Sequence, residues 1–393
     1  MRRTLRVFLC CQQDLRPHPL PAYRFWAEYF RQALAESGHV CLEAPGCDWA
    51  EGLLPLDPSA LAAWRIRTWR QAGQWIREEH ARQPIDIFIG YLFPGQVLPS
   101  ALAEIRSLGI PCVNFFCDNV REFRKIPAEF HSFDLHWVPE FKALPLYRHA
   151  ALPVLHAPMP CWVPPRWRTA VPANEETFPP GFVGTRDAQR EQLFGAAFAL
   201  GLTLDLRGTG WFEPAPAPTQ LSSRGGLSAR LGRQADFIRS QGWTAFVRKC
   251  LPEFDPRPMC NQSFAAHTRP SPTGNDYWRV IRGSKICVGV NRYPSLRFPF
   301  NRPDTYSRLR DIEAPMAGAC YLTEWTEGLD ELYDLGTEIE TYRTATELAG
   351  KVAELAADPR RRGRLRAAGQ RRALTHHSIA RTIERIANRL DLR

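Results

Sequence analysis

The sequence predicts an α/β protein built from two tandem, doubly wound domains that are joined by a hinge and followed by a basic helix. The chain has 393 residues, which exceeds one small domain and suits two of ordinary size. Short apolar runs typical of buried strands alternate with segments of helical periodicity, the pattern of parallel sheets covered on both faces. This alternation breaks off in a proline-rich stretch at 158–180 and then resumes, which indicates a linker between two domains.

The first half of the chain is predicted to begin with a strand and to continue with alternating strands and helices. The run 5–10 (LRVFLC) is apolar except for Arg6, and apolar side chains then recur at helical spacing until Gly38. Further strands are expected at 40–44, 85–91, 111–118 and 134–138, with a long helix around 61–76. We expect residues 1–165 to form the first domain.

The second half repeats the pattern around an insertion. Strands are expected at 181–185, 202–208, 285–291, 320–323 and 339–342, and helices at 189–200, 306–317 and from the capping box Thr344-x-x-Glu347 onward. Residues 211–276 are rich in Pro, Gly and Ser with weak periodicity, apart from a helix expected at 228–249, and are interpreted as an insertion. We expect a second domain at 166–375 and a C-terminal helical segment at 376–393.

Positive charge is concentrated at the end of the chain. The formal net charge is +10, and residues 351–393 hold twelve Lys or Arg against four Asp or Glu. Two interpretations stay open: attraction to an anionic membrane surface or substrate, and a solvated helix face. Nucleic acid is not expected as a partner, because no basic-aromatic module accompanies the charge.

Cysteine usage and hydropathy indicate a cytoplasmic protein, with contact at the inner face of the membrane if the basic segment binds lipid. The eleven cysteines include no Cys-x-x-Cys pair, which favours reduced thiols over a disulfide framework or a zinc site. No stretch approaches the 18 apolar residues of a spanning helix, and the first residues do not form a signal peptide.

Two strand-turn motifs contain glycine where a strand is expected to end. They are Phe182-Val183-Gly184-Thr185-Arg186 and Arg207-Gly208-Thr209-Gly210-Trp211. Glycine there lets backbone N–H groups approach an anion, and Arg186 and Arg190 would face a diphosphate from the next helical turn. Tight structural turns and ordinary surface charge are the alternatives.

A carboxylate precedes a small-residue turn in the block 306–324. Glu313 lies on an expected helix that ends at Ala317-Gly318 and feeds a buried strand. An acceptor-only carboxylate suits the two hydroxyls of a ribose. The alternative for Glu313 is an ordinary surface position on the helix.

The second half resembles the CgeB-like (spore maturation protein) glycosyltransferases, which belong with the group 1, family 4-like enzymes of the GT-B fold. The resemblance covers residues 277–380 and, more sparsely, 150–210. It rests on the segments 310–318 (RDIEAPMAG), 321–324, 328–332, 336–339, 347–348 and 358–360, with 152–158, 181–185, 207–211 and 284–291 in the same order upstream.

This resemblance implies two Rossmann-like domains that face a cleft (the GT-B fold), with a nucleotide-sugar donor held mainly by the second domain and the acceptor by the first. Glu313 matches the second glutamate of the family's Glu-x7-Glu signature, which binds the ribose. The first glutamate is replaced by Thr305, so either neighbouring Asp304 substitutes for it or the sugar pocket differs. The remaining candidate donor contacts are Gly184, Thr185, Arg186, Gly208, Arg279, Lys285 and Gly318.

The expected activity is therefore transfer of a hexose-type unit (EC 2.4) from a nucleoside diphosphate sugar to a glycan, lipid-linked or protein acceptor, with retention. No cofactor and no metal are expected, because no Asp-x-Asp motif is evident and the cations can stabilise the leaving diphosphate. Asp118, at the end of an expected strand, is the catalytic candidate of the first domain, with a turn cap as its alternative. His18, His136 and His156 are further candidates for proton carriers. The rival functions are a nucleotide-sugar epimerase or hydrolase on the same fold, and a non-catalytic surface or spore-coat-type binding protein.

Overall fold

The computed structural model describes residues 3–18, 24–169, 175–212, 234, 243–249, 262–293, 295 and 303–392. The chain divides into two compact units. The N-terminal unit comprises Met1–Trp162 together with His377–Arg393, and the C-terminal unit comprises Val163–His376. The last helix, α14 (Ile379–Arg389), thus returns to the N-terminal unit.

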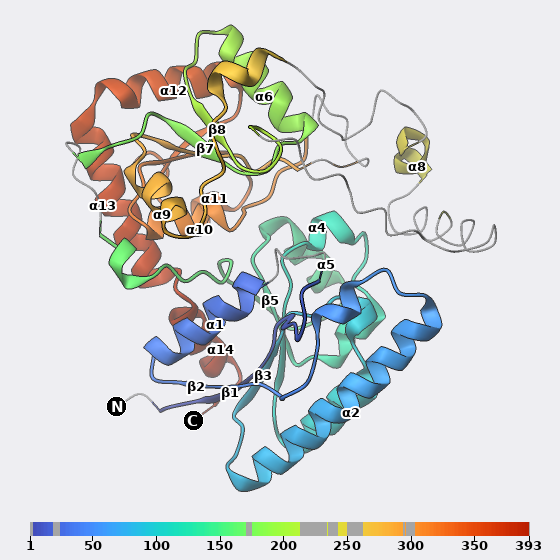
Figure 1. Ribbon diagram of the computed structural model, residues 1–393. Coiled ribbons are helices and arrows are strands. Elements are labelled where there is room, and N and C mark those ends of the chain that lie inside the picture. The colour runs from blue at the N-terminus through green and yellow to red at the C-terminus, as the bar shows by residue number, and fades with distance from the viewer. Residues whose placement is uncertain are drawn as a thin grey trace. The chain divides into compact units, whose positions relative to one another are not determined.

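The N-terminal unit is built on a six-stranded parallel sheet in the order β2-β1-β3-β4-β5-β6 (Figure 1). Its strands are β1 (Arg6–Cys10), β2 (Val40–Leu42), β3 (Ile87–Gly90), β4 (Cys112–Phe115), β5 (Leu135–Val138) and β6 (Val154–His156). Its helices besides α14 are α1 (Arg24–Glu36), α2 (Pro58–Arg82), α3 (Pro99–Ser107), α4 (Asn119–Glu122) and α5 (Leu144–His149). Helix α1 packs beside α14, and α2 beside α3.

Aromatic side chains fill both faces of this sheet. On the α2 side, the Phe88 ring stacks on Phe8 at 5.4 Å and on Trp69 at 6.0 Å. On the α1 side, Phe30 packs edge-on against Trp137 at 5.7 Å. Covered faces of this kind explain why the strands are almost uniformly apolar in sequence.

The C-terminal unit contains a five-stranded parallel sheet in the order β11-β10-β9-β7-β8, and Figure 1 labels its strands β7 and β8. Its strands are β7 (Gly181–Val183), β8 (Asp205–Arg207), β9 (Cys287–Gly289), β10 (Tyr321–Glu324) and β11 (Glu340–Tyr342). Its helices are α6 (Ala188–Ala199), α8 (Trp243–Lys249), α9 (Gly274–Gly283), α10 (Arg310–Met316), α11 (Leu329–Leu332), α12 (Ala345–Ala357) and α13 (Pro359–His376). Helix α6 packs against α12, and α10 against α13. The fold prediction of two parallel-sheet α/β domains with a C-terminal helical segment is confirmed.

Several predicted elements differ in extent from the structure. The helix predicted at 306–317 begins only at Arg310, because the Tyr306 N–H donates to the Asn291 carbonyl at 3.3 Å, next to the β-bridge between Thr305 and Arg292. Of the insertion predicted at 211–276, much lies outside the described residues, and of the helix predicted at 228–249 the structure describes α8 and residue 234. The predicted cap of α12 is confirmed: the Glu347 N–H donates to Thr344 Oγ1 at 3.1 Å.

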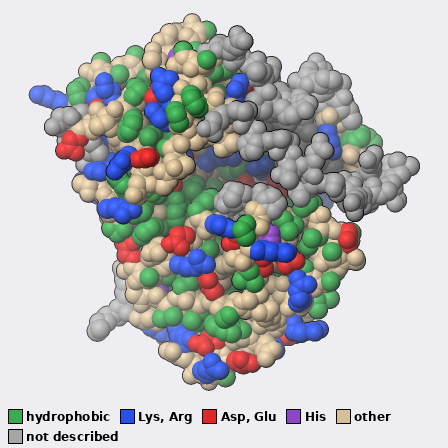
Figure 2. All heavy atoms as spheres, viewed as in Figure 1, with side chains coloured by type: hydrophobic (Ala, Val, Ile, Leu, Met, Phe, Trp, Pro, Cys, Tyr) green, Lys and Arg blue, Asp and Glu red, His purple; other side chains and the backbone are tan. Residues whose placement is uncertain are grey.

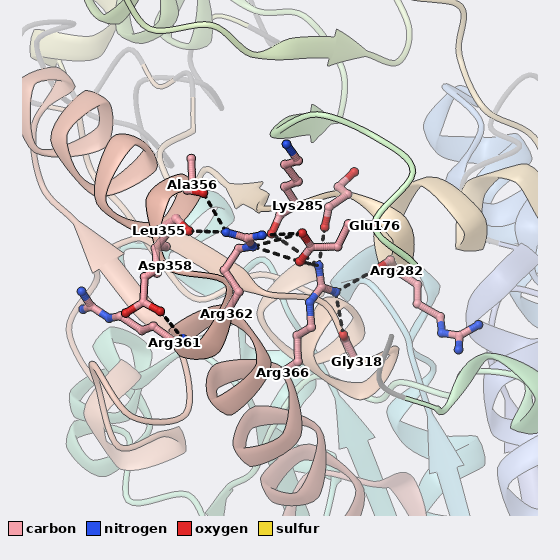
Figure 3. Close-up of polar contacts among 11 residues, drawn as sticks. Glu176, Arg282, Lys285, Gly318, Leu355, Ala356, Asp358, Arg361, Arg362 and Arg366 are labelled. Atoms are coloured by element: carbon pink, nitrogen blue, oxygen red, sulfur yellow. Dashed lines mark hydrogen bonds and ion pairs between the residues drawn. The ribbon is translucent and has the colours of Figure 1, made fainter. Parts of the chain in front are cut away.

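The basic segment near the C-terminus proves to be partly interior. Arg362 and Arg366 of α13 are buried and point toward Glu176, whose side chain is 2% exposed (Figure 3). The Arg362 guanidinium donates to Glu176 Oε2 at 2.6 Å, and that of Arg366 donates to Oε1 at 3.1 Å. Arg366 also donates to the carbonyls of Ser284 at 2.6 Å and Gly318 at 3.1 Å. These two arginines therefore hold the start of the C-terminal unit and the turns that precede β9 and β10.

The other arginines of α13 are distributed between partners and solvent. Arg361 pairs with Glu340, and Arg372 donates to the Leu332 carbonyl at 2.8 Å. Arg360, Arg364 and Arg371 are exposed. On the face drawn in Figure 2, the N-terminal unit shows basic and acidic side chains interspersed. No helix among the described residues is both long and apolar enough to cross a bilayer.

Candidate functional site

The two glycine turns meet at the carboxyl edge of the C-terminal sheet. The Gly184 N–H donates to the Arg207 carbonyl at 2.9 Å, and the Arg186 N–H donates to Thr209 at the same distance. Gly208 adopts a φ of +120°, and a Cβ there would lie 2.4 Å from the Gly184 carbonyl oxygen. Glycine is therefore required by the close approach of two backbones. The N–H groups of Gly184 and Arg186 bind the neighbouring turn.

Arg186 connects these turns to α6 through a hydrogen bond. Its Nε donates at 2.5 Å to Glu191, a carboxylate of α6 that is 3% exposed. Its guanidinium lies 5.6 Å from the ring centroids of Trp211 and Phe264. The side chain predicted to face a diphosphate is thus already bound to a carboxylate and two aromatic rings.

A cluster of three other arginines, Arg190, Arg308 and Arg310, lies at the end of β7. Arg190 is 9% exposed and donates to the Thr185 carbonyl at 2.5 Å. Arg310 donates to the Val183 carbonyl at 3.2 Å. Burial, together with the positive charges of Arg308 and Arg310, lowers the pKa of Arg190 to about 10. The repulsion felt by Arg190, which Asp187 at 3.3 Å offsets in part, is a cost that a bound polyanion would relieve.

Glu313 is joined to this arginine cluster. It is 3% exposed on α10, and its Oε2 lies 3.3 Å from the Arg310 guanidinium. The Tyr277 hydroxyl of α9 donates to the same oxygen. Glu313, the carboxylate predicted to bind a ribose, is therefore buried and lies beside the arginine cluster.

A cavity of about 350 Å³ opens at the same edge, near the ends of β9, β10 and β11. Thr305 lines it, and its Oγ1 is 3.0 Å from Thr326 Oγ1. Neighbouring Asp304 accepts a hydrogen bond from the Tyr293 hydroxyl at 2.8 Å. The cavity wall is otherwise formed by polar, aromatic and aliphatic side chains: Gln192, Leu193, Ala196, Arg292, Pro303, Glu324, Trp325, Arg343 and Ala345.

Two ion-containing pairs in this wall are ordered by their neighbours. Arg292 Nε donates to Glu324 Oε1 at 2.9 Å, and Glu324 Oε2 accepts the Arg292 N–H at 3.0 Å. The Arg343 guanidinium lies 3.5 Å from the centroid of the Trp325 ring. The cavity therefore has a preorganised polar wall suited to a polar ligand such as a sugar.

Three predicted donor contacts do not join the arginine cluster. Lys285 is exposed and lies two residues before β9, at the amino edge of the sheet (Figure 3). Gly318 precedes β10 at that same edge, where its carbonyl binds Arg366. Arg279 is exposed on α9, 3.2 Å from Asp276. Conversely, the sequence reasoning assigned no role to Arg308 and Arg310; the signal available was their position just before Glu313.

In the N-terminal unit, Asp118 follows β4 and borders a buried polar group. Asn119, next in the chain, accepts a hydrogen bond from the Tyr147 hydroxyl at 2.7 Å. Glu140, just after β5, accepts the Val120 N–H at 3.0 Å and is fully buried. Burial, and then the charge of Asp118, raises the pKa of Glu140 well above its ordinary value. Glu140 was not selected from the sequence, although it stands directly after a predicted strand.

The histidine candidates occupy different environments. His136 is fully buried among aromatic rings, and burial lowers its pKa to about 4. His18 contacts Asp48 at 2.9 Å. Within the described parts of the chain, no group of three or more His, Cys, Asp or Glu side chains is placed to hold a metal ion.

Comparisons with known proteins agree with this architecture. Residues 237–388 match a family model described as glycosyl transferase-like. No curated protein matches the sequence.

Solved structures of glycosyltransferases match over nearly the whole chain. Sucrose-phosphate synthase from Thermosynechococcus elongatus aligns with a TM-score of 0.58 at 14% identity, covering 99% of this chain and 100% of that one. A glycosyltransferase from Rickettsia africae aligns at 0.57 and 10% identity, covering 99% of each chain. Anabaena HepE in complex with UDP aligns at 0.55 and 11% identity, covering 99% and 100%. The chain thus has the two-domain fold of GT-B glycosyltransferases, and its residues 237–388 carry the glycosyl transferase-like match.

Proposed function

We propose that the protein is a glycosyltransferase that takes its sugar from a nucleoside diphosphate sugar. The observation that carries this proposal is the arginine cluster beside buried Glu313 at the carboxyl edge of the C-terminal sheet, the edge where ligands bind in doubly wound folds. Arg308, Arg310 and Glu313 also lie inside the segment that matches the glycosyl transferase-like model.

The chemistry of transfer explains why such a cluster is useful. Cleavage of the bond between sugar and phosphate leaves negative charge on the departing nucleoside diphosphate, and preorganised guanidinium groups stabilise that charge. We assign this role to Arg190, Arg308 and Arg310. Glu313 would accept hydrogen bonds from the ribose hydroxyls, and the cavity lined by Thr305 would receive the sugar.

The finer features of the reaction rest on the resemblance to CgeB-like and family 4-like enzymes. We propose transfer of a hexose-type unit with retention, to a glycan, lipid-linked or protein acceptor held by the N-terminal unit, with Asp118 near the reacting hydroxyl. HepE has been solved with UDP, with UDP and glucose, and with UDP-glucose, so uridine nucleotides are the first donors to try. Exposed Arg360, Arg364 and Arg371 would draw the enzyme to an anionic membrane surface.

The test is a binding screen followed by turnover. Thermal shift with UDP-, GDP- and dTDP-sugars should identify a stabilising donor, and a CMP-sugar, which carries a single phosphate, serves as the comparison. Calorimetry then measures the affinity of the stabilising donor. Glu313→Ala should weaken that affinity by about 1.5–3 kcal/mol, the range for a hydrogen bond to a charged group. Glu354→Ala, at an exposed carboxylate of α12, is the matched control and should change nothing. If no nucleotide sugar binds, or if Glu313→Ala binds like the control, the proposed donor site is wrong.

A further inference from the structure

Tyr277, Arg310 and Glu313 form a closed triangle of contacts between α9 and α10. The Tyr277 hydroxyl donates to Glu313 Oε2, and the Arg310 guanidinium lies 3.3 Å from that same oxygen. The third side of the triangle is a cation–π contact, with the guanidinium 5.1 Å from the centroid of the Tyr277 ring. Each side chain therefore restricts the other two.

The triangle is also tied to the sheet, and its hydrogen bond has a fixed direction. Arg310 donates to the Val183 carbonyl at 3.2 Å, which connects the triangle to the end of β7. Burial raises the pKa of Tyr277 well above its ordinary value, so the hydroxyl keeps its proton and acts as donor.

A carboxylate that binds a ribose diol must be oriented before the ligand arrives. Arg310 is three residues from Glu313 on the same short helix, so this pair alone links neighbouring turns and leaves the carboxylate free to change rotamer. Tyr277 comes from another helix and contacts the same oxygen, which removes that freedom.

We propose that Tyr277 is a positioning residue for donor recognition, whose hydroxyl holds Glu313 in the orientation that accepts the ribose hydroxyls. This inference rests on the proposed function, because it takes Glu313 as the ribose acceptor. A positioning role differs from a purely structural one in a measurable way: removing the Tyr277 hydroxyl should change the affinity only for nucleotides that carry the ribose diol.

The experiment is calorimetric titration of the full chain and its variants with two forms of one nucleotide. The ribonucleoside diphosphate is the tightest binder among UDP, GDP, ADP and CDP, and its partner is the 2′,3′-dideoxy form with the same base. Wild-type protein should prefer the diol form. Tyr277→Phe should weaken binding of the diol form about three- to tenfold and leave binding of the dideoxy form unchanged.

Two further variants keep the outcome interpretable. Glu313→Gln combined with Tyr277→Phe should bind no more weakly than Glu313→Gln alone, because the tyrosine acts through the glutamate. Tyr333→Phe is the matched control. It removes a buried tyrosine hydroxyl that donates at 2.7 Å to the Asp311 carbonyl of α10, and it should leave both affinities unchanged.

Three results would overturn the inference. Equal weakening of the diol and dideoxy forms in Tyr277→Phe would mean that the tyrosine only supports the fold. Tighter binding of the diol form by Tyr277→Phe would mean that the Tyr277 hydroxyl occupies the place of the ribose. If wild-type protein binds none of the four nucleotides, Glu313 receives no ribose diol and the inference fails; the proposed function fails with it only if dTDP does not bind either.

Discussion

Replacing Glu176 by Gln should strongly destabilise the C-terminal unit. The substitution keeps the size of the side chain but removes the carboxylate shared by Arg362 and Arg366, which are both buried. Two guanidinium groups would then remain in the interior without their counter-charge. Breaking a buried ion pair by removing one partner typically costs about 3–5 kcal/mol.

The urea denaturation midpoint gives a direct measure of this cost. With an m-value of about 3 kcal/mol/M, a loss of 3–5 kcal/mol corresponds to a fall of about 1–1.7 M for the transition of the C-terminal unit. Glu354→Gln is the control, because this carboxylate is 56% exposed in its contact with Arg361 and an exposed pair contributes about 0–1 kcal/mol. Equal midpoints for Glu176→Gln and the control would show that the buried ion pairs of Glu176 contribute no net stability.

Four other changes have defined outcomes. Gly208→Ala should lower the free energy of unfolding by about 1–3 kcal/mol, because the φ of +120° and the 2.4 Å approach to Gly184 exclude a side chain; an unchanged urea midpoint would contradict this. Burial lowers the pKa of His136 to about 4, below the 6.5 of an unfolded histidine, so as the pH falls the unfolded chain binds a proton before the folded chain does. The free energy of unfolding should therefore fall by about 2 kcal/mol between pH 7 and pH 5. His136→Phe should flatten that decline, and urea titrations at the two pH values test it. Turnover should survive EDTA, whereas loss on chelation with recovery in manganese would show that a metal carries the diphosphate. Sedimentation with anionic vesicles should fall with salt and in Arg364→Glu/Arg371→Glu, and equal recovery with neutral vesicles would remove the membrane proposal.

The alternation of strands and helices could be predicted because it depends on local periodicity. The boundaries that failed were set by contacts across the sheet. Tyr306 was predicted to begin a helix, yet its N–H donates to the Asn291 carbonyl and its neighbour Thr305 forms a β-bridge with Arg292, so the chain stays extended there. Tertiary pairing therefore overrode the local pattern.

Glu313 could be selected from its sequence context, but its surroundings could not. Its partner Tyr277 is 36 residues away, and neither composition nor spacing connects the two. Which arginines of α13 are buried also depends on a distant residue, because Arg362 and Arg366 pair with Glu176, which is 186 residues from Arg362. The sequence already argued against Lys285 as a donor contact. Ligands of parallel sheets bind at the carboxyl edge, and a residue that precedes a strand lies at the opposite, amino edge.

A crystal structure with a bound nucleotide would show whether a nucleoside diphosphate binds at the carboxyl edge of the C-terminal sheet. We expect phosphate oxygens within hydrogen-bonding distance of the guanidinium groups of the arginine cluster, and ribose hydroxyls donating to Glu313. A nucleotide at the amino edge beside Lys285, or one whose phosphates lie away from Arg190, Arg308 and Arg310, would mean that the proposed donor site is wrong.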